Sequence, residues 1–459
     1  MIFRIYPEKK AKSFVGGLII FSYFISPLDG LGANYFGRIM TGGYSSLETS
    51  KVPNDSSTSN NAATLSARFY LNVYDLTPKK MGVTVDLRDK NDYFEKLDQQ
   101  LLQLRPGNNF QVYQLNAHLL NNEDLVYATI GRFSMLDVGG EFVDGGEVGI
   151  RWSPVLRSSI FGGLEPKRYD QTYLTFNSNS RVFGTYAVYQ PVSGTWQKRT
   201  SWSTAVVGEN VESHLDRLFW YNNFIYQWDR SNQIFGIAYF DFTPSFYLQF
   251  GLLSYFQQIT DNFSSRLNLT GIDVIEYARR QGVLETLPSS PYREAALNLR
   301  STMSRGAFFE NNFIYGARQA DHLIRAEYTA GPSFYSLMDN HLSLGGVVGV
   351  RRNFIANEAL SQFKIAYFSR DWELELNVNY VLSVNNFAAT YHKWINDLSV
   401  MHFFTRDFMG ALSFQEAHDE NVQIWSGYFR LNYLFGQREV VRFHENDAPP
   451  LSQTPVLRM

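Results

Sequence analysis

The sequence predicts an all-β protein whose strands close into an antiparallel up-and-down β-barrel that spans a membrane. The chain begins with an export-type segment, alternates apolar and polar side chains at a period of two, and is 16% aromatic although its mean hydropathy is below zero. A period of two places apolar side chains on one face of a strand and polar ones on the other. Membrane barrels need both faces, and they gather aromatic residues at the two interfaces. We expect about 18 strands, within a range of roughly 16 to 20, and short helices in the loops.

The first 33 residues have the organisation of a signal peptide. Four basic residues precede an apolar run over residues 14–25, and small residues lead up to Ala33. The run is shorter than the about 20 residues that a membrane-spanning helix needs, so export followed by cleavage after Ala33 is expected. The sequence thus divides into a signal peptide at 1–33, a barrel at 34–435 and a disordered periplasmic tail at 436–459.

The clearest strand covers residues 372–384, in which Trp372, Leu374 and Leu376 alternate with Glu373 and Glu375. A tilted strand of about 9 to 11 residues crosses a bilayer. At about 22 residues for each strand with its connection, the chain has room for about 18 strands, so we expect some of the 21 candidates to be wrong. These candidates are 35–45, 63–74, 81–88, 110–118, 125–134, 146–153, 156–163, 181–190, 196–207, 217–228, 231–242, 245–257, 292–303, 306–317, 321–330, 340–351, 359–369, 372–384, 388–403, 407–416 and 421–435.

Short turns and long polar segments separate these candidates. The turns 369–371 and 405–407 are expected in the periplasm. Apolar residues at helical spacing favour short helices at 91–104 and 272–281, either packed on the rim or acting as a plug. The expected outer loops, which could also fold into the lumen, are 46–61, 90–107, 164–179 and 258–291.

The last candidate strand alternates Phe429, Leu431, Tyr433 and Phe435 with more polar residues. It resembles the aromatic terminal strand that the outer-membrane assembly machinery reads. Together with the export segment and the alternating strands, the chain resembles Gram-negative porin-like outer-membrane barrels. The resemblance implies a bacterial outer-membrane location, contact with membrane lipid, passage of small hydrophilic solutes, and either a monomer or a homotrimer.

A glycine-rich acidic segment at 137–147 lies between the fifth and sixth candidate strands, where porins carry a loop that narrows the pore. Asp137, Glu141 and Asp144 would create a negative field there, and Arg132 and Arg151 would form the opposing wall. Two other interpretations stay open. The segment could be a solvated hairpin loop, or it could bind calcium through Asp137, Glu141, Asp144 and Glu147.

Further charged side chains fall on the polar faces of candidate strands and would line the lumen. They could simply pair across neighbouring strands. A mixture of acids and bases suits a weakly selective channel. The residues are Arg68, Asp86, Arg88, Lys364, Glu373, Glu375 and Arg430.

Other functions have little support in the sequence. The absence of cysteine excludes disulfides and thiolate sites, and a net charge of −3 argues against nucleic-acid binding. We expect no cofactor or metal and no enzymatic activity, since no hydrolase or phosphate-binding motif occurs. A non-conducting adhesin or structural barrel and a soluble two-sheet protein remain alternatives. An outer-membrane hydrolase is a third, and it would have to recruit His118, His322, His392 or His402.

Overall fold

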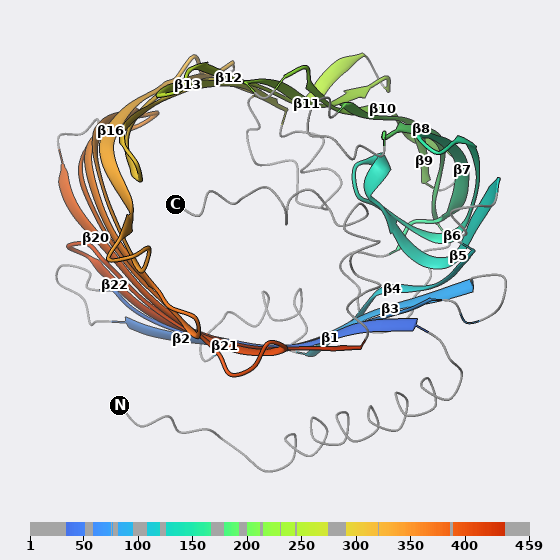
Figure 1. Cartoon of the computed structure of the whole chain (residues 1–459), viewed down its shortest axis with the longest axis horizontal. Coiled ribbons are helices and arrows are strands. Elements are labelled where there is room, and N and C mark those ends of the chain that lie inside the picture. Colours follow the sequence, from blue (N-terminus) through green and yellow to red (C-terminus); the bar gives the residue numbers. More distant parts are fainter. Residues whose placement is uncertain are drawn as a thin grey trace, which may run out of the picture.

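The computed structural model describes residues 34–50, 58–74, 76, 81–94, 108–119, 125–166, 179–191, 200–211, 214–229, 231–243, 246–273, 291–319, 321–385 and 389–436. These residues form a ring of 22 strands in which every strand pairs antiparallel with its neighbours in sequence (Figure 1). The first strand also pairs with the last, so the sheet closes. Closure gives every strand a partner strand on each side, which is what a strand structure needs in order to cross a membrane.

The ring begins with β1 (Asn34–Ser50), β2 (Thr58–Tyr74), β3 (Met81–Phe94), β4 (Asn108–Leu119), β5 (Val126–Met135), β6 (Glu141–Ser153), β7 (Leu156–Leu164), β8 (Ser180–Tyr189), β9 (Thr200–Val211), β10 (His214–Gln227) and β11 (Asn232–Asp241). It continues with β12 (Tyr247–Thr260), β13 (Phe263–Ile272), β14 (Tyr292–Ser304), β15 (Ala307–Arg318), β16 (Ile324–Leu337), β17 (Leu342–Asn353), β18 (Ala356–Phe368), β19 (Trp372–Asn385), β20 (Thr390–Phe403), β21 (Phe408–His418) and β22 (Val422–Gly436). One short 3₁₀ helix, η1 (Leu136–Val138), lies between β5 and β6.

The fold class is confirmed, but the expected number of about 18 strands is wrong. Hairpin turns such as Arg305-Gly306 and Asp261-Asn262 occupy only two residues, so a strand with its connection is shorter than we assumed. The candidate segments missed only β13, which lies inside the expected loop 258–291. In β13 the outward positions include Ser265 between Phe263 and Leu267, and this small polar residue weakens the apolar alternation.

An even number of antiparallel strands places the start of β1 and the end of β22 at the same end of the barrel, here called the near end; the opposite end is the far end. The turns 369–371 and 405–407, which were predicted to be periplasmic, both lie at the near end. Parts of the other expected loops are strand, because β1 extends to Ser50, β2 begins at Thr58 and β3 extends to Phe94. Most of the two expected helices, 91–104 and 272–281, and the segments 1–33 and 437–459 lie outside the described residues. No helix among the described residues is long and apolar enough to cross a membrane.

Apolar side chains point outward around the ring. In β19, Trp372, Leu374 and Leu376 are 44%, 37% and 36% exposed, whereas Glu373 and Glu375 are less exposed and face the interior. The alternation read from residues 372–384 therefore assigns the two faces correctly. A closed antiparallel ring with an apolar outer surface is the architecture of outer-membrane β-barrels.

Aromatic side chains gather on the outer surface near both ends. At the near end, Trp372 lies over His402 with ring centroids 4.1 Å apart, and His402 in turn contacts Phe404. Towards the far end, Tyr380 packs against Trp394 at 4.6 Å. These two zones correspond to the aromatic girdles that mark the membrane interfaces.

Candidate functional site: a hairpin folded into the barrel

The hairpin formed by β5, η1 and β6 leaves the barrel wall part of the way along β5. β4 pairs with β5 only from Leu115 to Leu119, although β4 itself begins at Asn108, closer to the far end. The departure begins at Gly131, whose φ of 122° lies in a region that residues with a side chain rarely adopt. Two further left-handed glycines, Gly139 and Gly140, close the hairpin tip, where the N–H of Gly140 donates to the carbonyl of Met135 at 2.9 Å.

The tip of this hairpin contacts strands that are not its neighbours in the sheet. Tyr239 of β11 donates its hydroxyl hydrogen to the carbonyl of Gly139 at 3.1 Å, and η1 packs against β8, β9 and β10. Outward-pointing residues of these strands, such as Trp202 and Val206, stay exposed, so the contacts are made on the inner face. The hairpin therefore crosses the interior and lies inside the ring beside β8 and β10 (Figure 1).

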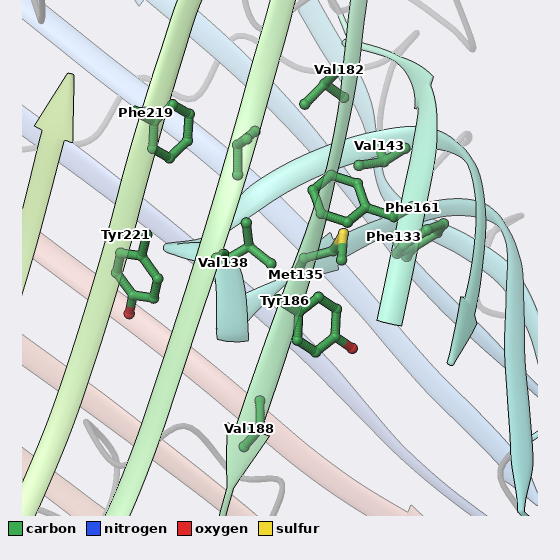
Figure 2. Close-up of a cluster of buried hydrophobic side chains, with 12 residues drawn as sticks. Phe133, Met135, Val138, Val143, Phe161, Val182, Tyr186, Val188, Phe219 and Tyr221 are labelled. Atoms are coloured by element: carbon green, nitrogen blue, oxygen red, sulfur yellow. The ribbon is translucent and has the colours of Figure 1, made fainter. Parts of the chain in front are cut away.

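The hairpin divides the interior into two parts. The side lobe is the space between the hairpin and the inner faces of β7–β11, and the main lumen is bounded by β1–β4, the hairpin and β12–β22. Figure 2 shows that hydrophobic side chains fill the side lobe, with Val138 and Phe219 completely buried. The buried core consists of Phe133, Met135, Val138, Val143, Phe161, Val182, Tyr186, Val188, Ala205, Val207, Phe219 and Tyr221.

Buried polar groups close the side lobe at both ends. Towards the near end, Tyr186 donates a hydrogen bond to Glu147, and its hydroxyl lies 3.3 Å from that of Tyr127. Towards the far end, Arg217 donates from Nε to Asp241 at 2.7 Å and lies 3.6 Å from Glu209. Because these polar groups are bonded to one another, the core between them can remain dry without leaving a buried charge uncompensated.

The predicted constriction residues lie on the hairpin or beside it, but they do not form two opposed charged walls. Arg132 and Asp144 form a bidentate ion pair at 2.5 and 2.6 Å, with side-chain exposures of only 9% and 2%. Arg132 also donates to the carbonyl of Val112 in β4 at 3.1 Å, so the pair ties the hairpin to the wall. Arg132 and Asp144 therefore stabilise the packing of the hairpin against the wall.

The other three predicted constriction residues are separated. Asp137 in η1 pairs with Arg157 of β7 at 2.6 Å, and both are about one-third exposed. Glu141 is 4% exposed at the start of β6, whereas Arg151 lies near the other end of that strand, 5.7 Å from the centre of the Tyr127 ring. The segment thus folds inward, but most of its charges are paired within the protein.

The predicted calcium ligands do not converge. Asp137 and Asp144 each bind an arginine, and Glu147 accepts from Tyr186. Within the described part of the chain, no three His, Asp or Glu side chains are placed to hold a metal ion.

Four arginines on adjacent strands around the closure form a basic wall: Arg38 of β1, Arg68 of β2, Arg88 of β3 and Arg430 of β22. Arg430 points inward because its neighbours Phe429 and Leu431 are exposed on the outside. Arg38 is close enough to Arg68 and Arg430 to be repelled by both.

The carboxylate of Asp86 partly balances this wall. Asp86 accepts from Arg68 at 2.8 and 2.5 Å, and the Arg68 side chain remains 44% exposed. Arg88 donates to the hydroxyl of Tyr113 at 3.3 Å. Excess positive charge therefore remains on this stretch of the inner face. Arg68, Arg88 and Arg430 were predicted to line the lumen, whereas Arg38 was not.

The remaining predicted lumen residues lie on β18 and β19. Lys364 and Glu375 form an ion pair at 2.8 Å across the two strands, and both are about one-third exposed or less. Glu373 also faces inward, two residues before Glu375 in β19 and therefore closer to the near end.

A charge ladder on β14–β18 was not predicted. Arg325 pairs with Glu294 at 3.2 Å and with Glu327 at 3.0 Å, and Arg351 pairs with Glu358 at 2.5 Å and approaches Glu327 at 3.9 Å. These five side chains alternate in sign across β14, β16, β17 and β18. The two-residue alternation places each of these side chains on the inward face of its strand. Only the register between strands shows that the side chains contact one another.

The histidines proposed for a hydrolase do not form a catalytic group. His392 and His402 belong to the outer aromatic zones, where His392 lies 2.7 Å from the hydroxyl of Tyr380. His118 is buried on the inner face beside Asn116.

Comparisons with known proteins give only distant likenesses. No family model matches the chain, and no curated protein matches it. Among solved structures, Pseudomonas aeruginosa OpdQ and Acinetobacter baumannii OccAB4 each align over 88% of this chain and 98% of their own, with 9% identity and a TM-score of 0.42. Pseudomonas aeruginosa OccK3 (OpdO) covers 88% and 96%, with 10% identity and a TM-score of 0.40.

Proposed function

We propose that this porin-like outer-membrane barrel is a channel through which small hydrophilic solutes diffuse passively. The observation that carries the proposal is the main lumen, whose wall presents the basic wall and the charge ladder inward while the outer surface is apolar. Charged side chains that face the interior of a closed barrel favour water and polar solutes there. Catalysis is not part of the proposal.

The β5–β6 hairpin is proposed to set the width of this pore on one side. Because the side lobe is filled with protein, solutes would pass only through the main lumen. The expected constriction is therefore a septum built from a packed hairpin, and Asp137, Glu141, Asp144, Arg132 and Arg151 act chiefly by holding that septum in place.

Selectivity is proposed to be weak and to favour anions near the closure. The charge ladder nearly cancels its own charge, whereas the basic wall combines four arginines with the carboxylate of Asp86 among the residues that the structure describes. An excess of one sign raises the local concentration of counter-ions in a narrow aqueous space.

The near end is proposed to face the periplasm, because single-chain bacterial barrels with an even strand number have their short turns there. The exposed aromatic side chains of β22, among them Phe429 and Tyr433, would be read by the assembly machinery during insertion. Whether the barrel works as a monomer or a trimer can be measured by mass in mild detergent.

Single-channel recording in planar lipid bilayers tests the proposal. Mature protein should produce stepwise conductance, and heat-unfolded protein from the same preparation should produce none. A non-conducting barrel that stays closed after residues 274–290 are removed would refute the channel and favour the structural or adhesive alternative. The deletion stops at these residues because a cut over 258–291 would remove β13.

A further inference from the structure

The outer surface has a groove where the wall bends between β4 and β7. In Figure 1 the wall turns sharply after β4, at the right of the ring, because the β5–β6 hairpin is drawn inward. The groove has a volume of about 520 Å³ and an almost entirely apolar lining. This volume is within the range of about 300–1,000 Å³ that is typical of small-molecule sites.

Two registered rows of outward-pointing residues build the groove. The first row runs across Met81, Leu119, Ala128, Val148 and Ile160, and the second across Ala117, Ile130, Gly146 and Gly162. The small residues of these rows form the floor. The larger ones form the sides, with Ile130 and Ile160 exposed by 69% and 67%.

Polar residues that alternate with these rows point to the other side of the wall. Glu147 accepts a hydrogen bond from Tyr186 inside the side lobe, and His118 faces inward beside Asn116. A polar ligand would therefore find few partners in the groove, and water there would lack the two to four hydrogen bonds that hold an ordered molecule.

We propose that the groove binds one acyl chain of a membrane phospholipid. Met81 begins β3 and Leu119 ends β4, so the groove opens in the half of the apolar belt next to the near end. Hydrocarbon chains are the medium that surrounds this surface. A concave apolar site holds a chain with more contact than the convex remainder of a barrel does, and each contact adds dispersion energy. If the near end faces the periplasm, the lipid comes from the inner leaflet.

Two glycines on the floor provide a test, because each has room for a side chain. An added Cβ would approach no atom closer than 3.7 Å at Gly146, where it meets the carbonyl of Thr129, or at Gly162, where it meets the Cβ of Phe183. Gly146→Leu or Gly162→Leu should fill the groove without disturbing the wall. Gly427→Leu is a matched control, because Gly427 of β22 pairs with the outward-facing Phe414 and has no atom within 4 Å of an added Cβ.

The barrels are refolded into vesicles of phosphatidylethanolamine and phosphatidylglycerol, extracted into mild detergent and weighed by native mass spectrometry. Wild type and Gly427→Leu should retain one phospholipid per barrel, and both groove variants should lose most of it. Ile130→Ala, which removes one side of the groove without adding bulk, should also reduce retention and serves if the leucine variants do not fold.

Several outcomes would overturn the proposal. Wild type could retain no lipid, or the groove variants could retain as much as Gly427→Leu. A lipid-free dimer that Gly146→Leu dissociates would assign the groove to a second copy of the chain instead. Conductance is recorded separately, and because the groove lies outside the lumen, a failure here leaves the proposed channel untouched.

Discussion

Two ion pairs of the β5–β6 hairpin differ in their access to water. Arg132–Asp144 is buried, with a second hydrogen bond between the two groups and a third to Val112. Arg157–Asp137 is about one-third exposed on each side. A buried charge that loses its partner cannot recover hydration, whereas an exposed one can.

Asp144→Asn should therefore destabilise the folded barrel by about 3–5 kcal/mol, because it leaves Arg132 buried without a counter-charge. Asp137→Asn should cost only about 0–1 kcal/mol, because the pair is screened by solvent. Urea unfolding in lipid vesicles measures both. Equal losses for the two variants would contradict the assignment.

Arg430→Ala should shift ion preference towards cations. Its Nε is buried and makes no hydrogen bond with the described residues, and Arg38 nearby adds positive charge. At roughly 8 Å in water, one positive charge attracts an anion and repels a cation by about 0.5 kcal/mol each, so the anion-to-cation permeability ratio should fall about fivefold.

The reversal potential across a salt gradient measures that ratio. Arg370→Ala is a suitable control, because Arg370 is exposed in the near-end turn between β18 and β19. If both substitutions shift the potential equally, the basic wall does not set selectivity.

Alternation alone predicted which charges face inward, as Glu373, Glu375 and Arg430 illustrate. It did not predict which of them meet, because pairing depends on the register between strands. Asp144 shows the same difficulty in another form, since its burial follows from the inward bend of the hairpin and not from its place in β6.

At the scale of elements, the hairpin of β5, η1 and β6 is held by hydrophobic packing on one face. Leu136 and Val138 belong to the same helical turn, yet Leu136 is 55% exposed and Val138 is completely buried. The turn therefore offers a buried position for substitution, Val138, and an exposed position as its control, Leu136.

Val138→Asp should release the hairpin tip from β8–β11, because an unpaired carboxylate in a dry core costs several kcal/mol. The released hairpin would move in the lumen and produce rapid fluctuations in single-channel current. Leu136→Asp should give quiet records like those of wild type. Indistinguishable records for the two variants would show that packing at Val138 does not hold the septum.

Most elements could be read from the sequence because each barrel strand carries its own two-residue alternation. β13 was not predicted because Ser265 occupies an outward position. The expected number of strands was too low because it assumed one average connection length. The inward path of the hairpin was only suggested by Asp137 to Glu147, since its docking on Tyr239 is a contact between residues 100 positions apart.

At the scale of the whole molecule, the barrel depends on the pairing of β1 with β22. Gly37 lies opposite Phe435 in this seam, and the Phe435 ring covers the glycine and stacks on Phe69 at 6.3 Å. An aromatic ring over a glycine of the partner strand is a known way to compensate for the missing side chain.

Gly37→Leu should obstruct this ring and lower the stability of the closed barrel by about 1–3 kcal/mol, as overpacking does. Gel mobility of unheated samples separates folded from unfolded barrel and gives the folded fraction. Gly427→Leu, on the outer face of the partner strand β22, should fold like wild type. A normal yield for Gly37→Leu would mean that the seam tolerates a displaced ring.

In an ordinary barrel, the number of strands fixes the bore. Here one hairpin folds inward and fills part of the enclosed cross-section with protein. The aperture of the passage therefore no longer follows from the circumference of the wall. A protein engineer could thus widen or narrow the passage by redesigning one pair of strands and leave the rest of the wall, with its contacts to lipid, as it is.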